Sequence, residues 1–159
     1  MLDRQLTGLE RGLVPLAEAF PESAYDFKPP ESAGKFSDVR TVREQLLHIA
    51  AGLDIFGASL LGEKTVIKNN DEMVKGPANI KTKAEVIKFL KDSFARAHKG
   101  VNTLTTENMM ERLDAPPFTN KFPRLSMVNI CIWHSYDHYG QLVVYARMNN
   151  IVPPASQRP

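Results

Sequence analysis

Apolar residues recur at steps of three and four along four segments of the chain, as they do on the buried face of a helix. The first helix is expected from about Asp3 to Phe20, with Pro21 ending it. Pro15 lies inside this pattern, so we expect a kink near Arg11, where the proline ring meets a backbone carbonyl. The apolar positions of this stripe are Leu2, Leu6, Leu9, Leu13, Leu16 and Phe20.

Two further helices begin at capping boxes, in which a threonine hydroxyl and a glutamate three residues later each accept a backbone N–H of the first turn. Thr41 and Glu44 open the second helix, and Gly62 is a natural stop for it. Thr82 and Glu85 open the third helix, whose apolar stripe continues to about residue 104.

The fourth helix is expected from about Ser126 to Asn149, with an apolar face that also carries two histidines. Asn150 suits the left-handed position after a helix, Ile151 can fold back on the last turn, and Pro153 forbids continuation. No segment alternates between apolar and polar residues for more than a few positions, so we expect no sheet.

Together these elements predict an all-α fold, a four-helix bundle that forms a single domain over residues 1–159. Helices of roughly 18 to 24 residues would be about 27 to 36 Å long, the size of such a bundle. The inter-helix loops are long for a bundle, so their lengths do not determine which helices are neighbours. Long loops also often carry a binding site.

Composition narrows the classes of partner and compartment. The formal net charge is +2, too small to imply nucleic acid as a partner. No run of about 18 apolar residues spans a membrane, and the N-terminus does not resemble a signal peptide. Cys131 is the single cysteine, so no internal disulfide can form, which fits a cytoplasmic protein.

His134 and His138 are the first candidates for chemistry. Their spacing of four residues stacks the two imidazoles on one helix face, where they can share a metal ion. This spacing alone is weak evidence, because it often arises by chance. The pair continues an apolar stripe, however, and two buried imidazoles are hard to satisfy without an ion or water.

His48 occupies a comparable position in the second helix. If the second and fourth helices are neighbours, three imidazoles converge, and three protein ligands with an open position are the pattern of a catalytic metal site. The alternative for His48 is a core histidine bonded to a backbone carbonyl. His98, beside Lys99 near the end of the third helix, is expected to be exposed and is left out of the site.

Two nearby polar residues could orient a ligand or a bound water. Glu44 lies one turn before His48, and Gln141 lies three residues after His138. Glu44 has the alternative role of a helix cap, which its position favours. Cys131 could also point toward the histidines, although a cysteine inside a helix usually packs as a small apolar residue. The sequence shows no convincing general base.

The motifs around these histidines resemble those of DinB/YfiT-like proteins. The resemblance rests on HSYDHYGQL at residues 134–142, IVPP at 151–154, EQLLHIA at 44–50 and AYDFKP at 24–29. It implies a four-helix bundle that holds a divalent metal ion on one histidine of the second helix and two of the fourth, here His48, His134 and His138. We expect zinc or nickel, while imidazole also suits copper and iron. The resemblance also implies a homodimer and does not imply DNA binding.

Characterised members of this family include thiol-dependent transferases and isomerases that use bacillithiol or mycothiol. Many members have no known activity, and nothing in this sequence singles out one of these reactions. Our leading hypothesis is a metal-dependent thiol transferase that joins a low-molecular-weight thiol to a small electrophilic molecule. Coordination would lower the pKa of the thiol toward neutrality. One alternative is a metal-dependent hydrolase that uses water alone. Another is a non-catalytic metal-binding stress protein, with Cys131 or Glu44 closing the coordination shell.

Overall fold

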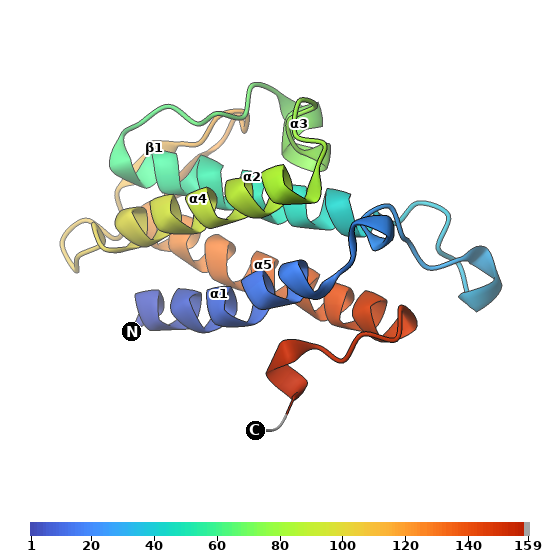
Figure 1. Ribbon diagram of the computed structural model, residues 1–159. Coiled ribbons are helices and arrows are strands. Elements are labelled where there is room, and N and C mark those ends of the chain that lie inside the picture. The colour runs from blue at the N-terminus through green and yellow to red at the C-terminus, as the bar shows by residue number, and fades with distance from the viewer. Residues whose placement is uncertain (158–159) are drawn as a thin grey trace.

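Helices dominate the computed structural model, which describes residues 1–157 (Figure 1). The long helices form a bundle, and a short helix and a two-stranded hairpin lie in the connections between them. The elements are α1 (Leu2–Ala19), α2 (Val42–Leu61), α3 (Asn70–Lys75), α4 (Lys83–Val101), β1 (Arg112–Asp114), β2 (Lys121–Pro123) and α5 (Arg124–Met148). Single 3-10 turns span Glu22–Ala24, Glu31–Ala33 and Pro154–Ser156. None of the helices within this range is long and apolar enough to cross a membrane.

The predicted starts of α2 and α4 and the predicted ends of α2 and α5 are confirmed by their local geometry. Both capping boxes form, at Thr41 for α2 and at Thr82 for α4. Gly62 follows α2 in the left-handed conformation, with φ of 71°. Asn150 follows α5 with φ of 58°, and the Ile151 N–H donates to the Ala146 carbonyl at 2.9 Å, which folds the chain back on the helix.

The four long helices pack in the cyclic order α1, α4, α2, α5. Figure 1 shows α1 and α5 running in one direction and α2 and α4 in the other. The chain therefore crosses the length of the bundle between α2 and α4, and α2 lies antiparallel to α5. This crossover uses the long loop that contains α3, and it makes α2 and α5 neighbours, as convergence of the three histidines requires.

Helices α2 and α4 approach each other closely because glycines face the contact. A Cβ added to Gly57 would lie 3.0 Å from the backbone nitrogen of Ala97, and one added to Gly100 would lie 3.0 Å from the Gly57 carbonyl oxygen. Contacts this short mean that a side chain at either glycine would force the two helices apart by a few tenths of an ångström. The core around them is built from leucines and aromatic residues, among which Leu6, Leu13, Leu46, Leu53, Leu90 and Phe94 are fully buried.

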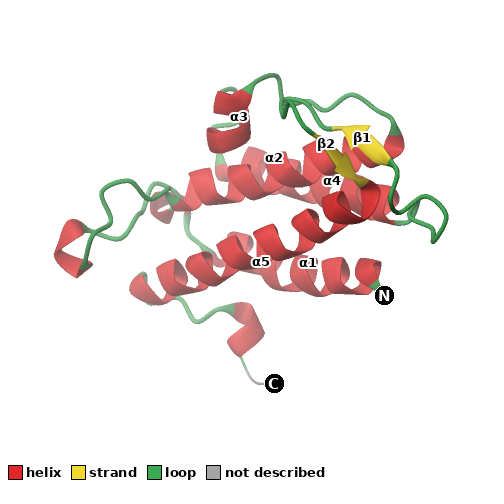
Figure 2. Ribbon diagram, turned by 180° about the vertical axis from the view of Figure 1, so that it is seen from behind, coloured by secondary structure: helices red, strands yellow, loops and turns green. Residues whose placement is uncertain are grey.

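The prediction that no sheet forms is wrong for the loop before α5. Strands β1 and β2 pair antiparallel, with Leu113 opposite Phe122. Each strand has only three residues and pairs only with the other, so no alternation is long enough to be read from the sequence. The helix α3 was also missed, because six residues are too few to show a helical period. Figure 2 shows α3 and the hairpin on the same side of the bundle, beside α2.

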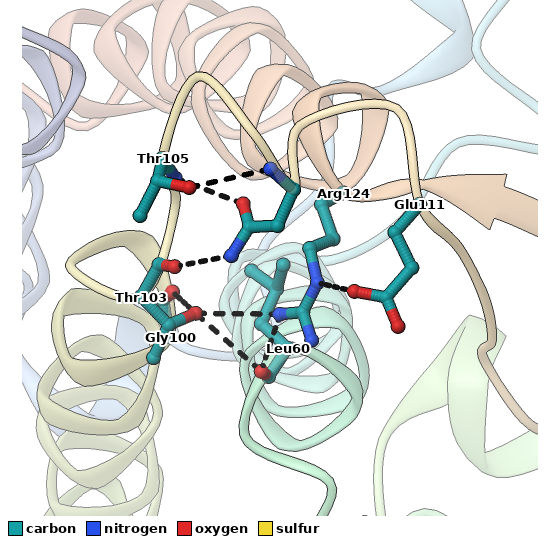
Figure 3. Close-up of polar contacts among 7 residues, drawn as sticks. Leu60, Gly100, Thr103, Thr105, Glu111 and Arg124 are labelled. Carbon is teal, nitrogen blue, oxygen red and sulfur yellow. Dashed lines mark hydrogen bonds and ion pairs between the residues drawn. The ribbon is translucent and has the colours of Figure 1, made fainter.

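Arg124, the first residue of α5, connects the hairpin to the end of α2 through hydrogen bonds (Figure 3). Its guanidinium donates to the Leu60 carbonyl at 2.9 Å and to the Glu111 carboxylate at 2.7 Å. The same guanidinium lies 3.4 Å from the Thr103 hydroxyl. One side chain therefore joins the C-terminus of α2, the turn after α4 and the base of the hairpin.

The helix α1 contains Pro15 and continues unbroken through it.

Candidate metal centre

Three imidazoles meet where α2 crosses α5. His48 comes from α2, while His134 and His138 lie one turn apart on α5. One ring nitrogen from each lies within 4.8 Å of the others, and the ring centroids are 4.6 to 4.9 Å apart. The convergence expected from the sequence is therefore confirmed, and its cause is the antiparallel packing of α2 on α5.

The backbone of α3 orients His48. The Nδ1 atom of His48 lies 2.7 Å from the Met73 carbonyl oxygen, which can only accept a hydrogen bond. Nδ1 must therefore carry the proton, and the lone pair of His48 is on Nε2. That Nε2 atom lies 3.0 Å from Nε2 of His134. The core-histidine alternative is thus half right: His48 does bond a carbonyl, and this bond aims its other nitrogen at the cluster.

His138 is oriented by Gln45, which was not among the candidates predicted from the sequence. Nδ1 of His138 lies 2.5 Å from the Gln45 side-chain oxygen. The Gln45 amide donates in turn to the Gln141 oxygen at 2.8 Å, and the Gln141 amide donates to the Asp137 carboxylate at 3.2 Å. Gln45 is 1% exposed. A glutamine among the apolar residues of α2, three before His48, was the signal that could have revealed it.

Burial keeps the three imidazoles neutral at neutral pH. Desolvation is the largest cause in each case, lowering the pKa of His48 to about 4 and that of His138 to about 3, and shifting the pKa of His134 in the same direction. The neighbouring imidazoles and the Arg40 guanidinium lower the pKa of His138 further. Neutral imidazole is the form that binds a metal ion, so each ring is in its ligating state.

The donor set fits one divalent ion of the kind that imidazole prefers. Two imidazole nitrogens bound to one tetrahedral zinc ion at about 2.0 to 2.1 Å are roughly 3.3 Å apart. The Nε2 atoms of His48 and His134 are 3.0 Å apart, and the three ligand nitrogens lie within 4.8 Å of one another, so the rings would have to move closer together around one ion. The other nitrogens of His48 and His138 already have acceptors, as those of metal-bound histidines usually do.

The remaining candidates fall outside the cluster. Glu44 is the N3 residue of the α2 capping box and accepts the Thr41 N–H at 2.8 Å, in agreement with its alternative role as a cap. Gln141 reaches His138 only through Gln45. Cys131 packs in the core, where burial raises the pKa of its thiol to about 12.

The prediction that His98 is exposed is wrong. Its side chain is half-buried between α4 and α1. Its Nδ1 lies 2.5 Å from the Asp3 carboxylate and its Nε2 lies 3.2 Å from the Glu10 carboxylate. The expectation failed because it considered only the polar neighbour Lys99 on the same helix. His98 joins two helices and is remote from the three clustered imidazoles.

A cavity of about 310 Å³ opens beside His48 and His134. Apart from these imidazoles its lining is apolar, and it is contributed by α2, α3, the hairpin and α5. The other lining residues are Gly52, Phe56, Met73, Phe118, Phe122 and Ile130. The two long connections before α4 and α5 therefore supply part of the cavity wall.

Bundle and cluster together define a helical protein with a candidate three-histidine metal centre. The sequence model of the DinB superfamily matches residues 5–142, most of the chain, so the chain belongs to the DinB superfamily. No protein of curated function is similar enough to count as a match.

A solved structure supports the fold independently of the family model. The crystal structure of a DinB-like protein, YjoA from Bacillus subtilis, is similar with a TM-score of 0.69. The alignment covers 99% of this chain and 99% of that chain, at 19% sequence identity. Identity at this level shows a shared bundle architecture and carries no statement about activity.

Proposed function

We propose that the protein is a metal-dependent enzyme whose divalent ion is held by His48, His134 and His138. The observation that carries this proposal is the convergence of three neutral imidazoles, two of them already hydrogen-bonded at Nδ1, on one point beside a cavity. Three histidine ligands leave a position for a reactant. A bound ion of this kind lowers the pKa of a coordinated thiol or water.

The reaction we propose is transfer of a low-molecular-weight thiol, of the bacillithiol or mycothiol type, to a small electrophilic molecule. The thiol sulfur forms a bond to the electrophilic carbon, a leaving group departs with the electron pair of the broken bond, and the thiol proton passes to solvent. In this scheme Gln45 and the Met73 carbonyl hold the imidazoles in place. The cavity binds the electrophile and excludes water from it.

Hydrolysis by water alone is the second reaction considered. Hydrolases commonly add a general base and hydrogen-bond donors for the developing oxyanion. The residues described as lining the cavity include neither a carboxylate nor a hydroxyl side chain. A thiolate needs neither group to attack an activated carbon, so the lining favours thiol transfer.

A closed, purely structural metal site is the third alternative. It would need a fourth protein ligand, for which Cys131 and Glu44 were the candidates. Within residues 1–157, His48, His134 and His138 form the only cluster of potential ligands, and it contains neither of these two residues. The donor set therefore favours an open coordination position.

We further propose zinc or nickel as the ion, because both accept imidazole ligands readily and availability decides between them. We also propose a homodimer located in the cytoplasm. The single cysteine is a free thiol, which fits a reducing compartment.

The test of this function is a reaction with a model electrophile. Zinc-loaded protein would be mixed with 1-chloro-2,4-dinitrobenzene, with and without a thiol such as cysteine or glutathione, and thioether formation followed by absorbance. We expect a protein-dependent rate that needs both metal and thiol and that His134→Ala abolishes. The same rate after the metal is removed with a chelator would contradict the proposal, whereas metal-dependent formation of 2,4-dinitrophenol without thiol would favour the hydrolase.

A further inference from the structure

The cavity beside the histidines has a wall made of phenylalanine. The rings of Phe56 and Phe118 stack with centroids 5.6 Å apart and an interplanar angle of 17°. Phe122 meets both rings edge-on, at 5.7 and 5.4 Å. Phe56 belongs to α2, while Phe118 and Phe122 belong to the hairpin, which Figure 2 shows beside α2. The wall is therefore a cluster of aromatic rings in stacked and edge-on contact, against which another aromatic ring packs well.

Gly52 contributes open space that helix packing does not require. A Cβ at this position would have His134 as its nearest neighbour, 3.6 Å from Nδ1, which is an ordinary contact. Alanine would therefore fit, and glycine inside a helix destabilises it by about 0.5–1 kcal/mol relative to alanine. Gly57 on the same helix differs, because a Cβ there would lie 3.0 Å from the backbone of α4. At Gly52 the missing side chain instead enlarges the cavity.

The cavity also lacks charge. Its described lining contains no carboxylate, lysine or arginine. A charged group placed there would lose its hydration without gaining a counter-ion, which is strongly unfavourable. Its volume of about 310 Å³ exceeds that of an apolar cavity of about 150 Å³ that binds benzene.

From these observations we infer that the cavity binds an uncharged aromatic ring. The ring lies between Gly52 and the phenylalanine wall. The substrate of the proposed reaction is then an aromatic electrophile. The role of the ring as part of a substrate rests on the proposed function. Binding of the ring itself does not, because the phenylalanine wall and the space at Gly52 are present without the metal. The metal-free protein should therefore still bind the ring.

The experiment compares benzyl alcohol with benzoate, which are similar in size but differ in charge. Binding to the protein, freed of metal with a chelator, would be measured by NMR chemical-shift titration. We expect benzyl alcohol to bind at least tenfold more tightly than benzoate. Gly52→Leu should weaken benzyl alcohol binding at least tenfold, whereas the control Gly140→Leu, on an exposed part of α5 with no neighbour within 4 Å, should leave it unchanged.

Equal affinities for the two probes, or unchanged binding in Gly52→Leu, would overturn the inference. Should Gly52→Leu fail to fold, nuclear Overhauser contacts in the wild-type protein decide the question. Bound benzyl alcohol must then contact Phe118 and Phe122, and contacts confined to other residues would overturn it. If the protein binds the ring but takes up no metal, the proposed function is contradicted while this inference is supported.

Discussion

The side-chain oxygen of Gln45 lies 2.5 Å from Nδ1 of His138, across the contact between α2 and α5. The amide of Gln45 is itself held, since its nitrogen donates to Gln141. This arrangement requires the oxygen of Gln45 to face His138, so it holds the proton of His138 on Nδ1 and leaves the lone pair on Nε2. One buried glutamine thus sets the orientation of a candidate ligand.

Replacing Gln45 should weaken metal binding without removing a ligand. We expect Gln45→Leu to lower zinc affinity by about 10- to 100-fold, because the imidazole loses the acceptor that fixes its tautomer. Gln45→Glu should restore affinity, since a carboxylate oxygen accepts the same hydrogen bond. Competition with a chromophoric chelator at pH 7.5 measures both.

The matched control for Gln45 is Gln141→Leu, one hydrogen bond further from the imidazole. Its affinity should fall by less than about tenfold, because loss at this distance leaves the His138 acceptor in place. An equal loss for the two leucine variants would show that Gln45 acts through general packing.

The free energy of unfolding of the metal-free protein should decrease as the pH is lowered below about 6.5. The unfolded chain protonates its histidines near pH 6.5, whereas folding lowers the pKa of His48 to about 4 and that of His138 to about 3. Between these values the unfolded state binds more protons, so acid favours unfolding. The stabilisation is complete above pH 6.5 and is lost as the pH falls toward 4 and then 3.

Denaturation by urea in the presence of a chelator, from pH 7.5 to 4.5, measures this effect. The midpoint should fall as the pH falls. In a His48→Gln and His138→Gln double variant the decline should be shallower, because those two protonation sites are gone. A double variant with the same pH dependence as the wild type would show that other groups control acid sensitivity.

Two glycine-to-alanine substitutions should have opposite effects on stability. Gly57→Ala places a methyl group 3.0 Å from the backbone of α4 and should destabilise the protein by about 1–3 kcal/mol through overpacking. Gly140→Ala, on the exposed face of α5, meets no atom within 4 Å and should stabilise by about 0.5–1 kcal/mol. Urea denaturation of the metal-free protein measures both, and effects of the same sign would contradict the close α2–α4 packing.

Much of the fold could be predicted from local sequence signals. The helices follow from periodicity, and their ends follow from capping boxes at Thr41 and Thr82 and from left-handed residues at Gly62 and Asn150. The hairpin could not be predicted, because three-residue strands carry no measurable alternation. The helix α3 is equally short, and the turn residues Asn69, Asn70 and Asp71 that begin it also occur in loops.

The site was predictable only in part, because its geometry is tertiary. The spacing of His134 and His138 is local, but the approach of His48 depends on α2 being next to α5, which long loops left open. The resemblance to DinB/YfiT-like proteins supplied that arrangement. Gln45 and the Met73 carbonyl escaped notice because each acquires its role by contact with a residue distant in the chain.

Metal stoichiometry tests the central claim most directly. Protein purified without a polyhistidine tag would be loaded with zinc, dialysed and analysed for metal and protein content, with His138→Ala and His98→Ala treated in parallel. The three-histidine centre predicts one ion per chain in the wild type and in His98→Ala, and a large loss in His138→Ala. Equal metal content in all three proteins, or no metal in the wild type, would contradict it.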